Sequence, residues 1–491
     1  MKFLKENKLG LTIILVFLVF ISMALILDPD VYWHIKAGEW ILENGIPQKD
    51  PFSYWGGNFI AHEWLFDVGL YSTYSIIGYV GLEILVLLLI SAITLFCFHM
   101  SQKEHASSFI SYVIPLAFIY YYGAGLITAR PHLISLALIC IEIFLLQNKK
   151  YKWFWIFPVF TLLTANIHGG SVPILIVILI IYFINYIYEN TKNLDRKILI
   201  GFIITAILMT LATLCNPYGL DTVLYGTKLP TVVQDYIKEW HPLVKDSTYI
   251  PALFMALIPI ACLSYSKKAK LIDVLMLFMG LMLTLVWRRM ILIYCCICII
   301  FATKHIDITI NDIWSKIKPN IKIKKKFNTK LLKMIFIDVL AIWLIFNVSF
   351  LSLTELEANS RISPTIIKNY IEENNIDVEN NIMFNHYNFG GYFIFNNYKV
   401  FMDGRNDVYL DTFGSPNVLP DYLDIIKVQK NTEELLEKYN IKYFTIYKES
   451  DLYDFLIDNN LAKELISDEK YAFLEKVEWI SIFSFYFKIS F

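Results

Sequence analysis

The sequence predicts a polytopic α-helical membrane protein of about eleven transmembrane helices, followed by a small α/β domain. Of its 491 residues, 56% are hydrophobic and only 18% are charged, which is more apolar than a soluble protein of this size. Apolar runs of about twenty residues recur along the chain, enough to cross a bilayer as helices. From residue 352 onward the sequence becomes more polar and alternates short helix-like and strand-like segments, the pattern of an α/β fold.

The apolar runs give the predicted spans. The first run, 9–27, is longer than the core of a signal peptide and lacks a small-residue cleavage site, so we predict a retained helix. Residues 64–78 have the spacing of an amphipathic helix on the membrane surface. The eleven predicted spans are 9–27, 79–100, 109–127, 132–147, 153–167, 171–189, 198–215, 250–265, 271–287, 290–303 and 331–351.

The distribution of lysine and arginine predicts the orientation. With the N-terminus in the cytoplasm, the inner segments carry 22 Lys and Arg residues and the outer segments carry 8, as the positive-inside rule requires. We therefore predict a multi-pass plasma-membrane protein with a cytoplasmic N-terminus. Residues 1–351 form the membrane domain, with a long first outer loop at 28–78, and residues 352–491 form the extracytoplasmic α/β domain.

The tail shows the expected local patterns. "TIIKNYIEENN", "TEELLEKYN" and "DLYDFLIDNN" have helical spacing, whereas "NIMF", "KVFMD" and "KYFTIY" are typical of short buried strands.

Composition also argues against some classes of protein and site. The net charge is −1 and no basic face stands out, so no nucleic-acid partner is expected. The seven cysteines lie in apolar segments or at their edges. We interpret them as small apolar fillers and predict neither disulfides nor a thiolate metal site.

Side chains able to do chemistry gather in the predicted outer segments. Asp28 and Asp30 follow the first span, where partial desolvation makes a carboxylate more basic. The stiff Asp-Pro-Asp backbone also holds two carboxylates in a way that suits a divalent cation. No other feature of the sequence requires a metal. Arginines bind phosphate through a fixed fork of donors. The remaining candidates for substrate binding are His62, Glu63, Arg130, His132, His168, Arg288 and Arg289.

Structural explanations compete with each assignment. The two aspartates can serve as a polar helix stop. Arg288 and Arg289 can snorkel to lipid headgroups. Each histidine, taken singly, can be a hydrogen-bonding residue without a chemical role. In the tail, Asp403 and Arg405 can form a network that holds a turn, or they can contact an acceptor. The paired glycines Gly390 and Gly391 permit either close backbone approach or a positive φ.

These residues resemble a known superfamily. An acidic motif after the first helix, many spans and an outer C-terminal domain are similar to the GT-C integral-membrane glycosyltransferases, which include the protein O-mannosyltransferases and the lipid A aminoarabinose transferase. More narrowly, "DPDVYWHIKAGEWILENGIPQKDPFSY" and "AHEWL" resemble a bacterial GT-C-like group that also has "RPH" and "HGG" turns. The tail of that group reads Gly-Gly-Tyr and then Asp-Gly-Arg, as in "NFGGY" and "MDGRN" here.

The resemblance implies an inverting glycosyltransferase that uses a polyprenyl-phosphate-linked sugar. Its acceptor would be an extracytoplasmic glycan, lipid or protein, and it would work among membrane lipids. Asp28 or Asp30 would then be the catalytic base or a metal ligand, and members of the superfamily differ in whether they need a metal. The sugar does not follow from the resemblance.

Two alternatives belong to other classes. A transporter or flippase for a lipid-linked or anionic substrate would place ionisable residues inside the membrane, and Glu83, Glu142 and Asp338 are its candidates. A non-catalytic scaffold that displays the tail domain would show few polar residues on its outer face.

Overall fold

The computed structural model describes residues 28–103, 127–317 and 362–477, except Asp235, Lys238, Glu239 and 246–249. These residues form two compact units. The first contains residues 62–317, and the second combines Asp28–Ala61 with residues 362–477. The first part of the predicted outer loop therefore packs with the C-terminal domain. The predicted boundary between residues 351 and 352 lies outside the described residues.

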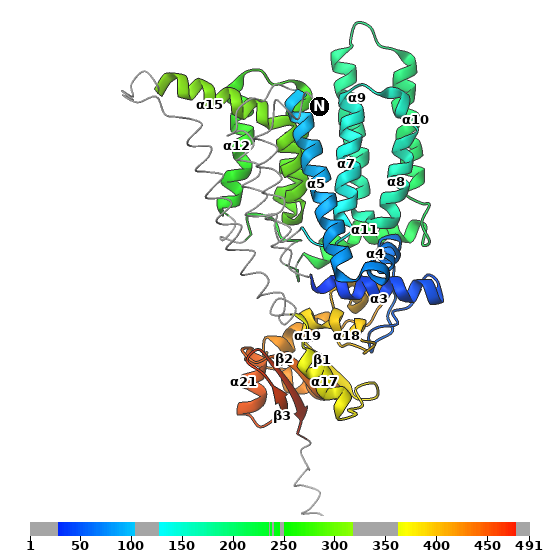
Figure 1. Cartoon of the computed structure of the whole chain (residues 1–491), viewed down its shortest axis with the longest axis vertical. Helices are drawn as coiled ribbons and strands as arrows, with labels where there is room; N and C mark the ends of the chain where they lie inside the picture. Colours follow the sequence, from blue (N-terminus) through cyan, green and yellow to red (C-terminus); the bar gives the residue numbers. More distant parts are fainter. Residues whose placement is uncertain are drawn as a thin grey trace, which may run out of the picture. The chain divides into compact units, whose positions relative to one another are not determined.

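The first unit is a bundle of helices (Figure 1). Its pairs include α5 with α7, α8 with α10, α12 with α15, and α13 with α14. A single apolar core joins them. The helices are α4 (Trp64–Ile77), α5 (Tyr79–Lys103), α7 (His132–Gln147), α8 (Ile156–Ile167), α9 (Val172–Glu189), α10 (Arg196–Ala212), α11 (Leu220–Val233), α12 (Ile250–Ser266), α13 (Leu271–Val286), α14 (Ile291–Ile297) and α15 (Thr303–Ile317).

Eight of the eleven predicted spans coincide with helices of this bundle, and α4 matches the predicted surface helix. The spans 9–27, 109–127 and 331–351 fall on segments outside the described residues, of which only residue 127 is described. Two helices were not predicted within the outer loops: α11, and α3 (Pro29–Asn44) in the second unit. The structure thus confirms the helical character of the apolar runs.

Three described stretches are long and apolar enough to cross a membrane: Ile84–Ser101, Gly169–Glu189 and Arg288–Lys316. Helices α7, α8, α12 and α13 are apolar but shorter. Large apolar side chains such as Leu88, Ile204 and Phe254 are at least half exposed on the helix surfaces, as expected for helices that face lipid. The total of eleven spans stays a prediction.

The last stretch is not a continuous α-helix. Between α14 and α15 the chain forms a π-helix, η8 (Cys298–Ala302). Such segments place one extra residue in a turn and occur frequently at functional sites.

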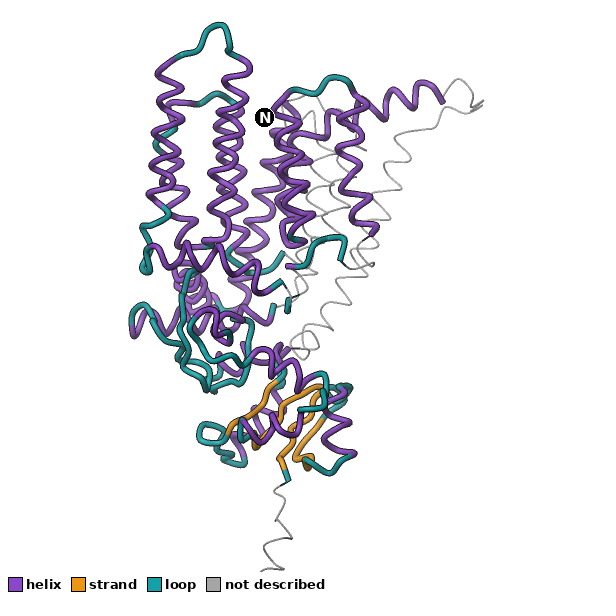
Figure 2. Tube along the Cα trace, turned by 180° about the vertical axis from the view of Figure 1, so that it is seen from behind, coloured by secondary structure: helices purple, strands orange, loops and turns teal. Residues whose placement is uncertain are grey.

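The second unit holds a β-sheet, whose strands are drawn in orange in Figure 2. The sheet is mixed and has four strands in the order β1-β2-β4-β3. Strand β1 (Ile382–Asn385) runs parallel to β2 (Ile441–Tyr447), and β4 (Tyr471–Lys476) is antiparallel to both β2 and β3 (Ala462–Ser467). Helix α17 (Thr365–Glu373) packs on β3 and β4, and α21 (Asp451–Asp458) on β2 and β3. The remaining helices are α18 (Gly390–Phe395), α19 (Leu419–Ile426) and α20 (Thr432–Lys438).

The predicted strands "NIMF" and "KYFTIY" are confirmed as β1 and β2, and the three predicted helices of the tail as α17, α20 and α21. The predicted strand "KVFMD" is wrong. Val400 makes only one isolated bridge, to Ser53. The buried side chain of Asn385 accepts from Phe401 N at 2.8 Å and donates to Met402 O at 2.7 Å. A side chain therefore satisfies backbone groups that a neighbouring strand would otherwise pair.

Helix α3 is part of the core of the second unit. Trp33, Ala37 and Phe52 pack in one apolar cluster with Phe393 and Phe473. At Gly391, an added Cβ would overlap Pro29 O, so α18 and α3 approach each other backbone to backbone. The predicted close approach at the paired glycines therefore occurs, and the partner is the helix that begins with the Asp-Pro-Asp motif.

Candidate functional site

A cavity of about 190 Å³ opens among the loops of the first unit. Its lining comes from four of the predicted outer segments. The polar and aromatic lining residues are His62, Glu63, His168, Thr222, Tyr225, Trp240, Trp287 and Arg289. The structure thus brings together four of the seven residues predicted to bind substrate.

A carboxylate with two histidines forms one side of the cavity. Glu63 Oε1 lies 3.6 Å from His62 Nε2 and 4.0 Å from His168 Nε2. The Nδ1 atom of His168 lies 2.7 Å from Ser171 Oγ, so this hydrogen bond fixes the ring with Nε2 toward Glu63. The side chain of Glu63 is 14% exposed. The cluster is therefore largely shielded from solvent but accessible from the cavity.

The local sequence explains this placement. Helix α8 ends at Ile167 because His168 adopts an extended conformation, and the chain restarts at Gly169. Asn166, in the last turn of α8, accepts from Trp64 Nε1 at 2.8 Å and donates at 2.9 Å to the carbonyl oxygen of Cys215, the residue directly before "NPYG". The "AHEW", "NIHGG" and "NPYG" motifs are thereby tied to one another. They set the positions of Glu63 and His168.

A cation on an aromatic platform forms another side. The Cζ atom of Arg289 lies 4.3 Å from the ring centroid of Trp240, and Trp240 meets Trp287 edge to face at 6.5 Å. Backbone hydrogen bonds from Arg288 N to His241 O and from Leu243 N to Leu285 O hold this turn. Stacking restricts the guanidinium, and Arg289 places a positive charge in the lining of the cavity.

Three further predicted residues belong to the first unit. His132 lies beside the cavity, with its ring centroid 6.3 Å from that of His168. Arg130 and Arg288 are not among the residues that line the cavity. Arg288 adjoins the lining residue Arg289, and Arg130 lies two positions before His132, which is itself beside the cavity and not part of its lining.

Asp28 and Asp30 belong to the second unit. Asp28 is the N-cap of α3, and its Oδ1 accepts from Asp30 N at 2.9 Å, a common stabilising motif at helix starts. Asp30 Oδ1 lies so close to Gly404 that a Cβ there would overlap it. These contacts explain how the two carboxylates are held, and their catalytic role stays a prediction.

A buried ion network stands beside Asp30. Arg405 donates to both carboxylate oxygens of Asp403, at 2.9 and 2.7 Å, and to Asp50 Oδ1 at 2.6 Å. The hydroxyl of Tyr409 donates to Asp403. Burial opposes the charge of Arg405, but the carboxylates of Asp403 and Asp50 outweigh it and raise the pKa of the guanidinium above its ordinary value. The Asp-Gly-Arg motif therefore has a structural role that joins residues 28–61 to the tail.

Sequence reasoning missed several of these residues. Tyr225 lies on α11, which was not predicted, although the last residue of "NPYG", Gly219, is the N-cap of that helix and has a positive φ. Asp50 lies 355 positions from Arg405, and nothing local marks it as an ion-pair partner. Trp240 and Trp287 lie in motifs assigned to outer segments, but their sequence positions do not show that they share a cavity.

The described residues contain one group with the spacing of metal ligands: Cys97, Cys140 and Cys296. Asp28 and Asp30 form no such group with a third ligand among them. The three thiols meet one another inside the bundle, which the interpretation of the cysteines as small apolar fillers did not predict.

No known family model matches this sequence, and no curated protein is detectably similar to it.

Proposed function

We propose that this protein is a membrane glycosyltransferase that moves a sugar from a polyprenyl-phosphate donor to an extracytoplasmic acceptor with inversion. The observation that carries the proposal is a single cavity lined both by a carboxylate with two histidines and by a stacked arginine. The resemblance to the GT-C superfamily supports the same reaction class. In this proposal the cavity faces the outer side of the plasma membrane.

The reaction needs two functions that the cavity residues can supply. An acceptor hydroxyl attacks the anomeric carbon, the bond from that carbon to the phosphate oxygen breaks, and the hydroxyl proton passes to a base. Glu63, between His62 and His168, is suited to take that proton. Arg289 is suited to neutralise the polyprenyl phosphate as it leaves, with Arg130 and Arg288 as further candidates in adjoining turns. Two aromatic rings in the cavity lining, those of Tyr225 and Trp287, suit the apolar face of a sugar ring.

Asp28 and Asp30 remain candidates for the same proton acceptor. Their capping and packing contacts account for their presence without chemistry. The role of each carboxylate is therefore decided by comparing Asp28→Asn, Asp30→Asn and Glu63→Gln. A divalent cation, if one is required, would involve the two aspartates.

The test uses full-length protein in lipid nanodiscs with polyprenyl-phosphate-linked hexoses and pentoses, a bacterial envelope extract as acceptor, and release of polyprenyl phosphate as readout. We expect Glu63→Gln to lower turnover by about 10²-fold or more. Arg289→Lys keeps the charge but loses the fork, and should lower turnover by about 10²-fold. The exposed Arg196 provides the matched control, Arg196→Lys, which should keep turnover.

Turnover that survives Glu63→Gln but fails with either aspartate variant would move the base to Asp28 or Asp30. Turnover unchanged in all three carboxylate variants would refute the proposed mechanism. No release from any donor by the wild-type protein would refute the proposed function.

One observation favours transport as a second candidate. Glu142 on α7 is fully buried, and neither carboxylate oxygen has a hydrogen-bond partner among the described residues. Burying a carboxylate in an apolar helix costs free energy, so such a residue is a candidate for a functional role. The other candidates, the Glu83 side chain and Asp338, lie outside the described residues. Movement of a fluorescent polyprenyl phosphate across liposomes, abolished by Glu142→Gln but not by Glu63→Gln, would favour the transporter.

A further inference from the structure

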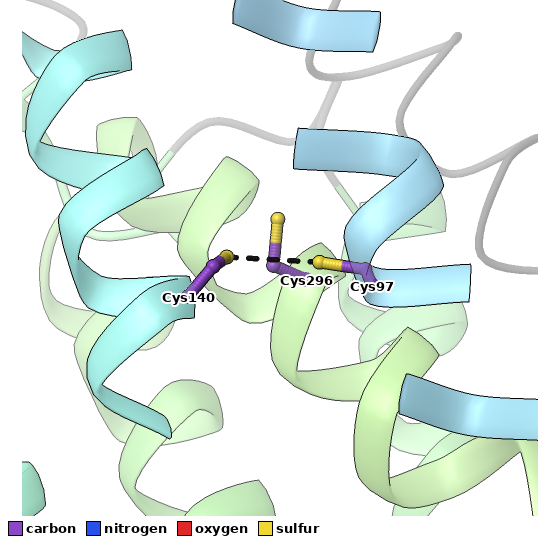
Figure 3. A group of neighbouring side chains, drawn as sticks. All are labelled: Cys97, Cys140 and Cys296. Carbon is purple, nitrogen blue, oxygen red and sulfur yellow. Dashed lines mark hydrogen bonds between the residues drawn. The ribbon is translucent and has the colours of Figure 1, made fainter. Parts of the chain in front are cut away.

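Three thiols from three different helices meet inside the first unit (Figure 3). Cys97 lies on α5, Cys140 on α7 and Cys296 on α14. The Sγ atoms of Cys97 and Cys140 are 3.6 Å apart, and all three Sγ atoms lie within 4.8 Å of one another. Their residues are between 0% and 6% exposed. The cluster is therefore a small set of soft donor atoms shielded from water.

This convergence is selective. Cys295 and Cys298 are also buried and lie on the same stretch of helix as Cys296, yet neither joins the cluster. If cysteine served only as a small apolar filler, the buried thiols would have no reason to meet. Cys296 also lies two residues before the π-helix η8, which packs against α5 and changes the helical phase next to the cluster.

The spacing fits a single metal ion. A metal–sulfur bond of about 2.3 Å places the sulfurs of a trigonal site about 4.0 Å apart, and those of a tetrahedral site about 3.8 Å apart. The observed separations, 3.6 Å for one pair and no more than 4.8 Å for the others, surround those values. Small side-chain rotations would bring all three sulfurs into bonding distance of one ion.

The number of sulfur ligands indicates which metal ion the cluster would bind. Thiolates prefer soft ions such as Cu(I) and Zn(II), but structural zinc takes four ligands. Among the described residues, no fourth His, Cys, Asp or Glu ligand joins the group. Metal-bound cysteines are thiolates, and each one releases a proton when it binds. Three thiolates with one monovalent ion therefore carry a net charge of −2, and the number of ligands, not the charge, favours Cu(I) over structural zinc.

We propose that Cys97, Cys140 and Cys296 form a binding site for Cu(I). The ion is taken up already reduced, so binding exchanges protons for metal and involves no electron transfer. The site is separate from the cavity, whose lining contains none of these cysteines. It joins α5, α7 and α14, so the bound ion would cross-link three helices of the bundle.

The experiment uses full-length protein in nanodiscs, reduced and kept anaerobic. It carries a Cys215→Ser, Cys262→Ser background, because these cysteines are exposed or partly exposed and would bind copper adventitiously. Copper(I) is added with a competing chelator. Bound copper is then counted by mass spectrometry, and its ligands are read by X-ray absorption. We expect one copper per chain with about three sulfur neighbours.

Single Cys97→Ser, Cys140→Ser and Cys296→Ser variants should each lower copper retention at least tenfold. Cys295→Ser is the matched control, because it changes a buried thiol on the same helix, and it should retain copper. Gel filtration of each variant checks folding, and Cys→Ala replaces any serine variant that does not fold.

Absence of bound copper in the background protein would overturn the proposal. So would equal loss in the Cys295→Ser control, or Zn(II) that is retained against the chelator while Cu(I) is not. Because no sugar donor enters this assay, its outcome is independent of the proposed transferase reaction.

Discussion

Replacing Arg405 with methionine should severely destabilise the second unit. The guanidinium is 3% exposed and makes three hydrogen bonds to the carboxylates of Asp403 and Asp50. Its Cζ also lies 5.0 Å from the ring centroids of both Phe52 and Phe59. Methionine retains much of the apolar volume, so the substitution removes mainly the charge and its donors.

The expected loss in the free energy of unfolding follows from the two charges that Arg405→Met leaves buried. In the native network two carboxylates face one guanidinium, and Arg405→Met leaves both carboxylates buried without their cation. Breaking a buried pair in this way costs about 3–5 kcal/mol, against a typical domain stability of about 5–15 kcal/mol. The segment 28–61 should then separate from the tail, because Asp50 is its charged anchor.

Asp50→Asn provides the comparison. Asparagine Oδ1 still accepts from Arg405 Nη1 and from Phe52 N, and only the bond from Ser53 N to the second oxygen is lost. One lost hydrogen bond costs about 1 kcal/mol. The free energy of unfolding should therefore fall at least 2 kcal/mol further in Arg405→Met than in Asp50→Asn.

The assay is a urea titration of the full-length protein in detergent, with brief proteolysis at each step and the cleavage sites mapped by mass spectrometry. Cleavage within residues 28–61 and 362–477 reports the second unit separately from the helix bundle. If Arg405→Met shifts the transition by less than 1 kcal/mol, or no more than Asp50→Asn does, the ion network does not anchor the segment as argued.

The same assay checks three further predictions. Gly404→Ala should cost about 1–3 kcal/mol because its Cβ overlaps Asp30 Oδ1, and adding Asp30→Ala should restore part of that loss. Asn385→Ala should cost about 2–3 kcal/mol because it leaves buried backbone groups unpaired, whereas the exposed Asn459→Ala should cost far less. Burial lowers the pKa of His386 to about 4, and its Nδ1 accepts from Asn388 N. The unfolded chain therefore binds the proton more tightly, so stability should fall between pH 6.5 and 4, by at most about 2 kcal/mol at pH 5. His386→Asn keeps an acceptor at the cap and should lose most of that pH dependence.

The helices and part of the sheet could be predicted because their signals are local. Apolar runs and strand alternation mark α5, α9 and β2 within a few residues. The stretch 399–403 misled the prediction, because its short run of apolar residues between two charged ones is typical of a buried strand. The side chain of Asn385 and the chain near Phe52 take its backbone hydrogen bonds instead. Which partner satisfies a backbone group is a tertiary fact that a short window does not contain.

A short sequence window also fails to distinguish two kinds of motif in this chain, those that line the cavity and those that stabilise the fold. "AHEW", "NIHGG" and "WRRM" each offer polar residues beside an apolar run, which predicts a shared membrane face. Their candidate residues His62, Glu63, His168 and Arg289 do line one cavity. "DPD" offers the same signal, yet its carboxylates are the N-cap of α3 and the close neighbour of Gly404. A carboxylate after a span thus has two local explanations that look identical in sequence. They differ in what substitution does: a capping aspartate changes stability and leaves the chemical step intact, whereas a base changes turnover in a folded protein. Measuring both quantities on Asp28→Asn and Glu63→Gln therefore assigns each carboxylate without knowledge of the substrate's sugar.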